Sequence, residues 1–158
     1  MPRLRFLAPL VAAACLVLAA TAWAQNDRDP SRDVFLQTIG MLAGQGLVFG
    51  HENLEGICVR YEKRLLPRDQ ALSLLADAGR YTDWVLATFK EHLMARLDAG
   101  GQQDLTLLIG FYELQRQTIE ALAVYVRSGS AKNRENFQNL QSKVAAVIGR
   151  ISLGGRKP

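Results

Sequence analysis

The chain has 158 residues, with 19 Lys and Arg against 15 Asp and Glu and a formal net charge of +4. Nucleic-acid binding requires basic residues clustered on one face, and this weak charge argues against it. With only two cysteines, Cys15 and Cys58, the fold must depend on a hydrophobic core and not on a disulfide framework.

Residues 1–24 have the layout of a secretory signal peptide. Arg3 and Arg5 form a short basic start, residues 7–20 are apolar, and Ala22-Trp23-Ala24 offers a cleavage site. The apolar run is shorter than the roughly 20 residues that a permanent membrane span requires. We therefore expect a periplasmic or secreted protein whose mature chain, residues 25–158, has no membrane span.

A lipoprotein tethered through Cys15 is the alternative, because Ala12-Ala13-Ala14-Cys15 loosely resembles a lipobox. A strongly apolar stretch follows that cysteine, where a lipoprotein has a polar tether, so cleavage after Ala24 is preferred. Cleavage removes Arg3 and Arg5, and the net charge falls from +4 to +2. The remaining residues, 25–158, are enough for one domain.

Four segments show the periodicity of helices. The first, residues 31–65, follows Asp29-Pro30, an N-cap with proline at the first helical position. Its apolar stripe continues through Gly40 to Gly50, where two interpretations stay open. Either one helix uses small residues at a close helix contact, with Gly40 and Gly50 facing a neighbour, or the helix breaks there.

Residues 71–97 form the most strongly patterned helix, after a stop at Pro67. Its predicted core stripe consists of Ala71, Leu74, Ala78, Tyr81, Val85 and Phe89. Glycines at 100 and 101 indicate its end. A third helix is predicted from Asp104 to Arg127 and a fourth after Ser130, as N-cap, to Ile151. Short connections and the absence of alternating strand patterns predict an all-α, up-down-up-down four-helix bundle.

Histidines next to carboxylates are the only residues that suggest a metal site. His51 with Glu52 and Glu55, and His92 with Glu91, fall on two predicted helices. Antiparallel pairing separates the two histidines by about 15 Å along the axis, and the Glu-x-x-His repeat of di-metal bundles is absent. We therefore predict no metal and no cofactor.

A haem held between Met41 and His92 is also not expected, because Met41 points away from its own apolar stripe. His92 falls inside the predicted apolar face, where we expect a hydrogen bond to a neighbour such as Tyr112. It remains the candidate ligand-binding or pH-sensitive residue. Gln115 lies at the centre of the apolar stripe of the third predicted helix, and we predict a structural role for it.

The second and third predicted helices carry more apolar residues than one bundle core uses. This excess predicts an interaction surface for a protein partner or a second copy of the chain, formed by Leu72, Leu86, Leu97, Leu107, Leu114 and Tyr125. No nucleophile, phosphate-binding or dinucleotide-binding motif occurs. We therefore expect a non-enzymatic protein that binds another protein, the alternative being a small-ligand, metal or haem carrier that uses a histidine.

N-terminal sequencing of the mature protein tests the predicted export. Cleavage after Ala24 should yield a chain that begins at Gln25. A chain that begins at a lipid-modified Cys15 would instead show a membrane-tethered lipoprotein.

Overall fold

The computed structural model describes residues 30–154, and all regular structure in this range is helical. The α-helices are α2 (Pro30–Glu62), α3 (Arg68–Ala87), α4 (Ala99–Ser128) and α5 (Ala131–Gly154). A π-helical segment, Thr88–Leu93, and a 3₁₀ turn, Met94–Arg96, extend α3. The prediction of an all-α fold with four helices and no strand is confirmed for these residues, whereas the predicted signal peptide, 1–24, lies outside them.

The chain divides into two compact units between Gly40 and Met41, inside α2. Of the first unit, the structure describes residues 30–40, the beginning of α2, where the Thr38 hydroxyl donates a hydrogen bond to the Val34 carbonyl oxygen at 2.8 Å. The backbone of α2 is helical throughout residues 40–50, so the continuous-helix interpretation of the glycine stretch is the correct one. The packing described below is that of residues 41–154.

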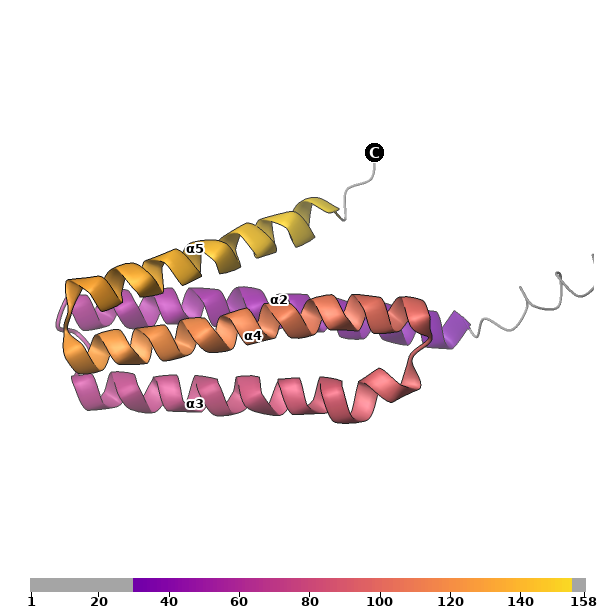
Figure 1. Ribbon diagram of the computed structural model, residues 1–158, viewed down its shortest axis with the longest axis horizontal. Helices are drawn as coiled ribbons and strands as arrows, with labels where there is room; N and C mark the ends of the chain where they lie inside the picture. Colours follow the sequence, from indigo (N-terminus) through magenta and orange to yellow (C-terminus); the bar gives the residue numbers. More distant parts are fainter. Residues whose placement is uncertain (1–29, 155–158) are drawn as a thin grey trace, which may run out of the picture. The chain divides into compact units, whose positions relative to one another are not determined.

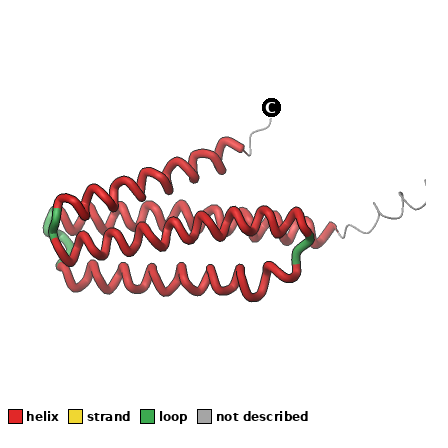
Figure 2. The backbone as a smooth tube through the Cα atoms, in the orientation of Figure 1, coloured by secondary structure: helices red, strands yellow, loops and turns green. Residues whose placement is uncertain are grey.

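Consecutive helices in this second unit are antiparallel. Figures 1 and 2 show the turns at 63–67 and 129–130 at one end, and the turn at 97–98 at the other. We call the first of these the double-turn end. α4 lies between α3 and α5 in Figure 1 and packs against both.

The turns explain where the helices end. α2 stops where Arg64 takes a left-handed conformation with φ of 59°, and Pro67 precedes α3. Gly129, with φ of 65°, ends α4, and Ser130 Oγ accepts a hydrogen bond from the Asn133 amide at 3.4 Å as the predicted N-cap of α5.

The start of α4 differs from the prediction. The carboxylate of Asp98 accepts a hydrogen bond from the Gly101 amide at 2.9 Å, and α4 begins at Ala99, five residues before the predicted Asp104. Gly100 and Gly101 therefore lie in the first turn of a helix and do not terminate one. Because aspartate is among the strongest N-cap residues, it initiates this helix in spite of the glycines.

The buried apolar side chains form two clusters. The cluster near the double-turn end contains Leu54, Ile57, Cys58, Leu66, Ala71, Leu75, Ile119, Ala121, Leu122, Ala123, Tyr125, Val126 and Phe137. The second contains Ala43, Leu47, Val85, Phe89, Leu105, Ile109 and Tyr112. All four helices contribute to the first cluster, but the second has no residue from α5. The core thus rests on α2, α3 and α4, and α5 joins it near the double-turn end.

Two glycines of α2 allow α4 to approach closely. A Cβ added at Gly46 would lie 2.7 Å from the hydroxyl oxygen of Tyr112, and one at Gly50 would overlap Nε2 of Gln115. The Tyr112 hydroxyl donates a hydrogen bond to the Ala43 carbonyl oxygen on α2 at 2.9 Å. The predicted close contact at Gly50 is present. Gly46 makes a second close contact, and the predicted contact at Gly40, which belongs to the other compact unit, stays a prediction.

Replacing Gly50 tests this contact. Leucine at this position must displace buried Gln115, and we expect the variant to lose about 1–3 kcal/mol of unfolding free energy by overpacking. The matched control is Gly56→Leu, because Gly56 is exposed and has open space around it. That control should be neutral or stabilising, since leucine is a better helix former than glycine. Chemical denaturation measures both, and equal stabilities would contradict the close contact.

Candidate functional site

The six residues of the predicted interaction surface do not form one exposed surface. Tyr125 is buried, and Leu72 packs on the same core cluster. Leu86 and Leu97 pack against the other cluster. Leu114 is half-buried, and only Leu107 is largely exposed, at 56%. The excess apolar character of α3 and α4 is therefore mostly used inside the fold, because α4 contacts helices on both of its sides.

His92 is exposed, which corrects the prediction that it lies in the apolar face. It belongs to the π-helical segment, in which the extra residue per turn rotates the following side chains away from the positions of a regular helix. Leu93 is half-buried in its place. The expected hydrogen bond to Tyr112 is absent, since the Tyr112 hydroxyl donates to Ala43.

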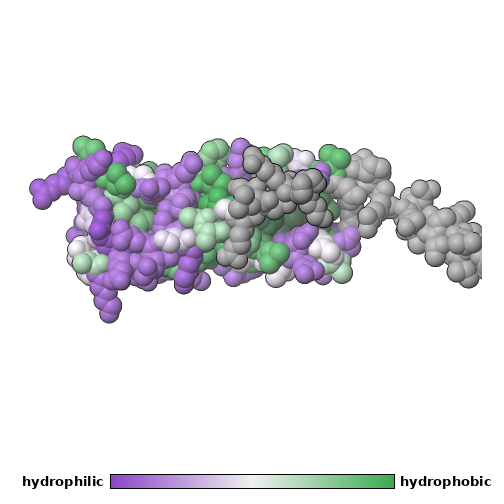
Figure 3. All heavy atoms as spheres, turned by 90° about the horizontal axis from the view of Figure 1, so that it is seen from above, coloured by the Kyte–Doolittle hydropathy of each residue, from purple (hydrophilic) through white to green (hydrophobic). Residues whose placement is uncertain are grey.

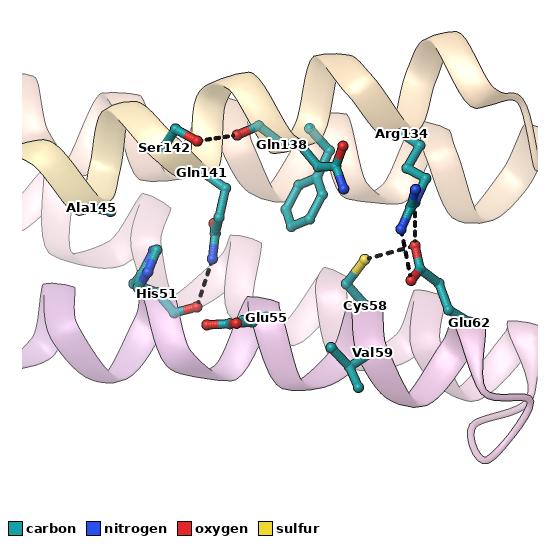
Figure 4. A pocket seen from close by; sticks show the side chains of 11 residues that line it. His51, Glu55, Cys58, Val59, Glu62, Arg134, Gln138, Gln141, Ser142 and Ala145 are labelled. Atoms are coloured by element: carbon teal, nitrogen blue, oxygen red, sulfur yellow. Dashed lines mark hydrogen bonds and ion pairs between the residues drawn. The ribbon is translucent and has the colours of Figure 1, made fainter.

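A groove with mixed polar and apolar walls lies between α2 and α5. It has a volume of about 460 Å³ and is lined by His51, Glu55, Cys58, Val59, Glu62, Arg134, Phe137, Gln138, Gln141, Ser142 and Ala145. We call it the α2–α5 groove (Figure 4). The face that bears α5 is mainly hydrophilic at the double-turn end and more apolar toward its middle (Figure 3). The sequence analysis singled out His51 and Glu55 but did not place them against α5.

Glu62 joins three helices at the double-turn end of the groove. Its Oε1 accepts hydrogen bonds from Arg134 Nε on α5 at 2.6 Å and from the Tyr125 hydroxyl on α4 at 3.3 Å. Its Oε2 accepts a second hydrogen bond from Arg134, at 3.2 Å. The Cys58 thiol donates to the same carboxylate at 3.7 Å. Such a two-pronged arginine–carboxylate pair fixes geometry as well as adding attraction.

These contacts set the protonation of the groups involved. The hydrogen bond from Arg134 lowers the pKa of Glu62, so the carboxylate is charged at neutral pH. Burial, and then the charge of Glu62, raise the pKa of Cys58 to about 11. The Cys58 thiol is therefore protonated at neutral pH and is a poor nucleophile. This part of the groove organises the three helices and provides no reactive group.

Farther from the double-turn end, two buried polar atoms in the groove lack hydrogen-bond partners. They are Nδ1 of His51 and Oε1 of Gln141. The side-chain nitrogen of Gln141 does have a partner, because Nε2 donates a hydrogen bond to the His51 backbone carbonyl oxygen at 3.0 Å (Figure 4). A buried polar atom without a partner costs about 1–3 kcal/mol, so the pair marks a position that a hydrogen-bonding ligand would stabilise.

Within residues 30–154, no three His, Cys, Asp or Glu side chains are grouped so that they would hold a metal ion. None of the described helices is both long and apolar enough to span a membrane.

Large aromatic and aliphatic side chains are also exposed on α2 and α3. They are Leu42 (59% exposed), Phe49 (61%), Leu74 (39%), Tyr81 (57%) and Trp84 (63%). We call this set the aromatic strip. Leu42 and Phe49 are spaced by two helical turns and share one side of α2, and the other three share one side of α3.

Tyr81 of α3 affects Tyr112 of α4 electrostatically. Burial, and then proximity to Tyr81, raise the pKa of Tyr112 to about 12. The hydroxyl of Tyr112 itself is bound to the α2 backbone at Ala43. Phe49 on α2 is about as far from the 63–67 turn as Tyr81 on α3, so the antiparallel helices bring the two residues level.

The sequence analysis placed Leu74 and Tyr81 in the core stripe of their helix, which was wrong. The buried stripe of α3 is Ala71, Leu75, Gly79, Thr82 and Val85. Gly79 and Thr82 are buried, and a Cβ at Gly79 would lie 3.7 Å from Cζ of Arg116 on α4, an ordinary van der Waals contact. The helix is thereby rotated toward its small residues, which leaves Leu74 and Tyr81 at the edge.

Comparisons with known proteins leave the chain without a family. No protein-family model, no curated protein and no solved structure matches it.

The Glu62 junction predicts a pH-dependent stability. Because the pKa of Glu62 is lowered in the folded state, its contribution is present at neutral pH and lost as the pH falls through that lowered value. Glu62→Gln should therefore melt below wild type at pH 7, and the difference should shrink in acid. Glu52→Gln, which changes an exposed carboxylate on the same helix, is the control. A constant difference at every pH would contradict this role of the charge.

Proposed function

We propose that this chain is an exported, non-enzymatic helical protein that binds another protein through the aromatic strip. The carrying observation is that Phe49, Tyr81 and Trp84 are each more than half exposed, and that the ring centroids of Tyr81 and Trp84 lie 6.0 Å apart. Scattered single apolar residues are normal on a protein surface, whereas a group of large ones marks an interaction site. Tryptophan and tyrosine are also the residues that most often dominate binding energy at protein interfaces.

The occupant that fits the strip best is a helix or loop of a different protein with apolar side chains in its centre. Two neighbouring helices with exposed aromatic side chains provide an apolar surface for such a segment. Exposed polar side chains lie beside and among the strip residues on α3, where Arg80 and Asp77 form an ion pair. An apolar centre with a polar rim is the usual anatomy of a non-obligate interface. Export is supported by the signal-like residues 1–24.

Site-specific photo-crosslinking in the native host tests the proposal. A photoreactive amino acid at Trp84 should yield an adduct with one protein, whereas the same group at Leu65 should not. Leu65 is the matched control, because it is 69% exposed but lies in the turn before α3, outside the strip.

Mutation then tests whether the adduct depends on the strip. Phe49→Glu, with the photoreactive group retained at position 84, should weaken the interaction by about 2 kcal/mol or more, as expected for the loss of a buried aromatic contact. Leu65→Glu should have no effect. Circular dichroism should show unchanged helicity for both, since both side chains are exposed. An adduct containing only a second copy of the chain would replace the proposed partner by self-association, and no adduct at Trp84 would contradict the proposal.

A further inference from the structure

Two polar atoms that line the α2–α5 groove have no hydrogen-bond partner. His51 Nδ1 and Gln141 Oε1 are buried and unpartnered. The orientation of the Gln141 amide is fixed by the hydrogen bond from its Nε2 to the His51 carbonyl, so the oxygen is the atom that remains available. In the tautomer with its proton on Nε2, His51 also presents an acceptor to the groove.

A carboxylate lies one helical turn from this pair. Glu55 lines the groove four residues after His51 on the same face of α2, and it is exposed. Figure 4 shows its side chain on the α2 wall, next to His51 along the helix. The groove thus offers a negative charge beside two neutral acceptors.

Three side-chain donors in the groove, on Arg134, Cys58 and Ser142, have partners. Arg134 donates to Glu62 through two hydrogen bonds, which neutralises the groove's cation. The Cys58 thiol also donates to Glu62. The Ser142 hydroxyl donates to the Gln138 carbonyl oxygen. A ligand with N–H donors and a positive charge therefore complements the unpartnered acceptors and the Glu55 carboxylate, whereas an anion would be repelled by Glu55 and would find Arg134 already paired with Glu62.

The remaining wall is apolar. Phe137, Val59 and Ala145 line the groove together with its polar groups. The volume of about 460 Å³ is within the range of small-molecule sites. Apolar walls with a few convergent polar groups suit a ligand that has a charged end and a hydrocarbon chain.

We propose that the α2–α5 groove binds a primary amine. Its ammonium group donates hydrogen bonds to His51 Nδ1, Gln141 Oε1 and the Glu55 carboxylate, and its hydrocarbon chain packs against Phe137. A metal ion is a poorer match, because no three side chains of ligating type are grouped among residues 30–154. This site does not depend on the aromatic strip and is separate from the proposed protein interface.

The experiment titrates the full mature chain with three probes of equal chain length and follows backbone amide resonances by NMR. The probes are butylamine, butanol and butyrate, all at the same pH and ionic strength. Butylamine should shift the amides of His51, Gln141 and Phe137 in a saturable manner, and butanol and butyrate should bind at least tenfold more weakly. Equal binding of butyrate, or no shift with butylamine, would overturn the proposal.

Two variants locate the contact. Glu55→Gln should weaken butylamine binding about tenfold or more, because it removes a charged hydrogen-bond acceptor. Glu52→Gln removes an equally exposed carboxylate outside the groove lining and should leave the affinity unchanged. Equal weakening by both would show non-specific attraction to negative charge and overturn the site. A Zn²⁺ titration that shifts the same amides at lower concentration than butylamine would assign the site to a metal instead.

Discussion

The close contact between α2 and α4 is the constraint on which the rest of the packing depends. Gly46 and Gly50 remove side chains where Tyr112 and Gln115 of α4 press against α2. The Tyr112 hydroxyl then satisfies the Ala43 carbonyl oxygen at 2.9 Å. Burying Gln115 in this position costs free energy, because its Oε1 has no hydrogen-bond partner. The glycines therefore lower the helix propensity of α2 but allow α4 to pack closely against it.

The two candidate sites arise at the edges of this interface. α5 meets α2 through the Glu62–Arg134 junction at the double-turn end and through Gln141 at His51. At the second of these contacts, His51 Nδ1 and Gln141 Oε1 have no partners. On the other side, α3 turns Gly79 and Thr82 inward, which leaves Tyr81 and Trp84 exposed. One interface thus explains a polar groove on one flank and an aromatic strip on another.

The fold could be predicted from the sequence because helix periodicity, Pro67 and Ser130 are local signals. The rotation of each helix could not, since it depends on which small residues a neighbour meets. Tyr81 belongs to an apolar stripe by spacing, yet Gly79 determines the buried face of α3. His92 was misplaced because nothing local predicted the π-helical segment that turns it outward. Of the groove, His51 and Glu55 were noticed. Gln141 reaches His51 from 90 residues away and Arg134 reaches Glu62 from 72 residues away, and periodicity does not encode such tertiary contacts.

Native-state hydrogen exchange tests most directly whether the α2–α4 interface is the foundation of the fold. Amides of α2 between Leu47 and Ile57 and of α4 between Tyr112 and Val126 should exchange slowest, at a common rate set by global unfolding. Amides of α5 after Ser142 should exchange faster, through local opening, because α5 has no residue in the second core cluster. Fast exchange throughout residues 47–57, or protection of α5 equal to that of α4, would contradict this account.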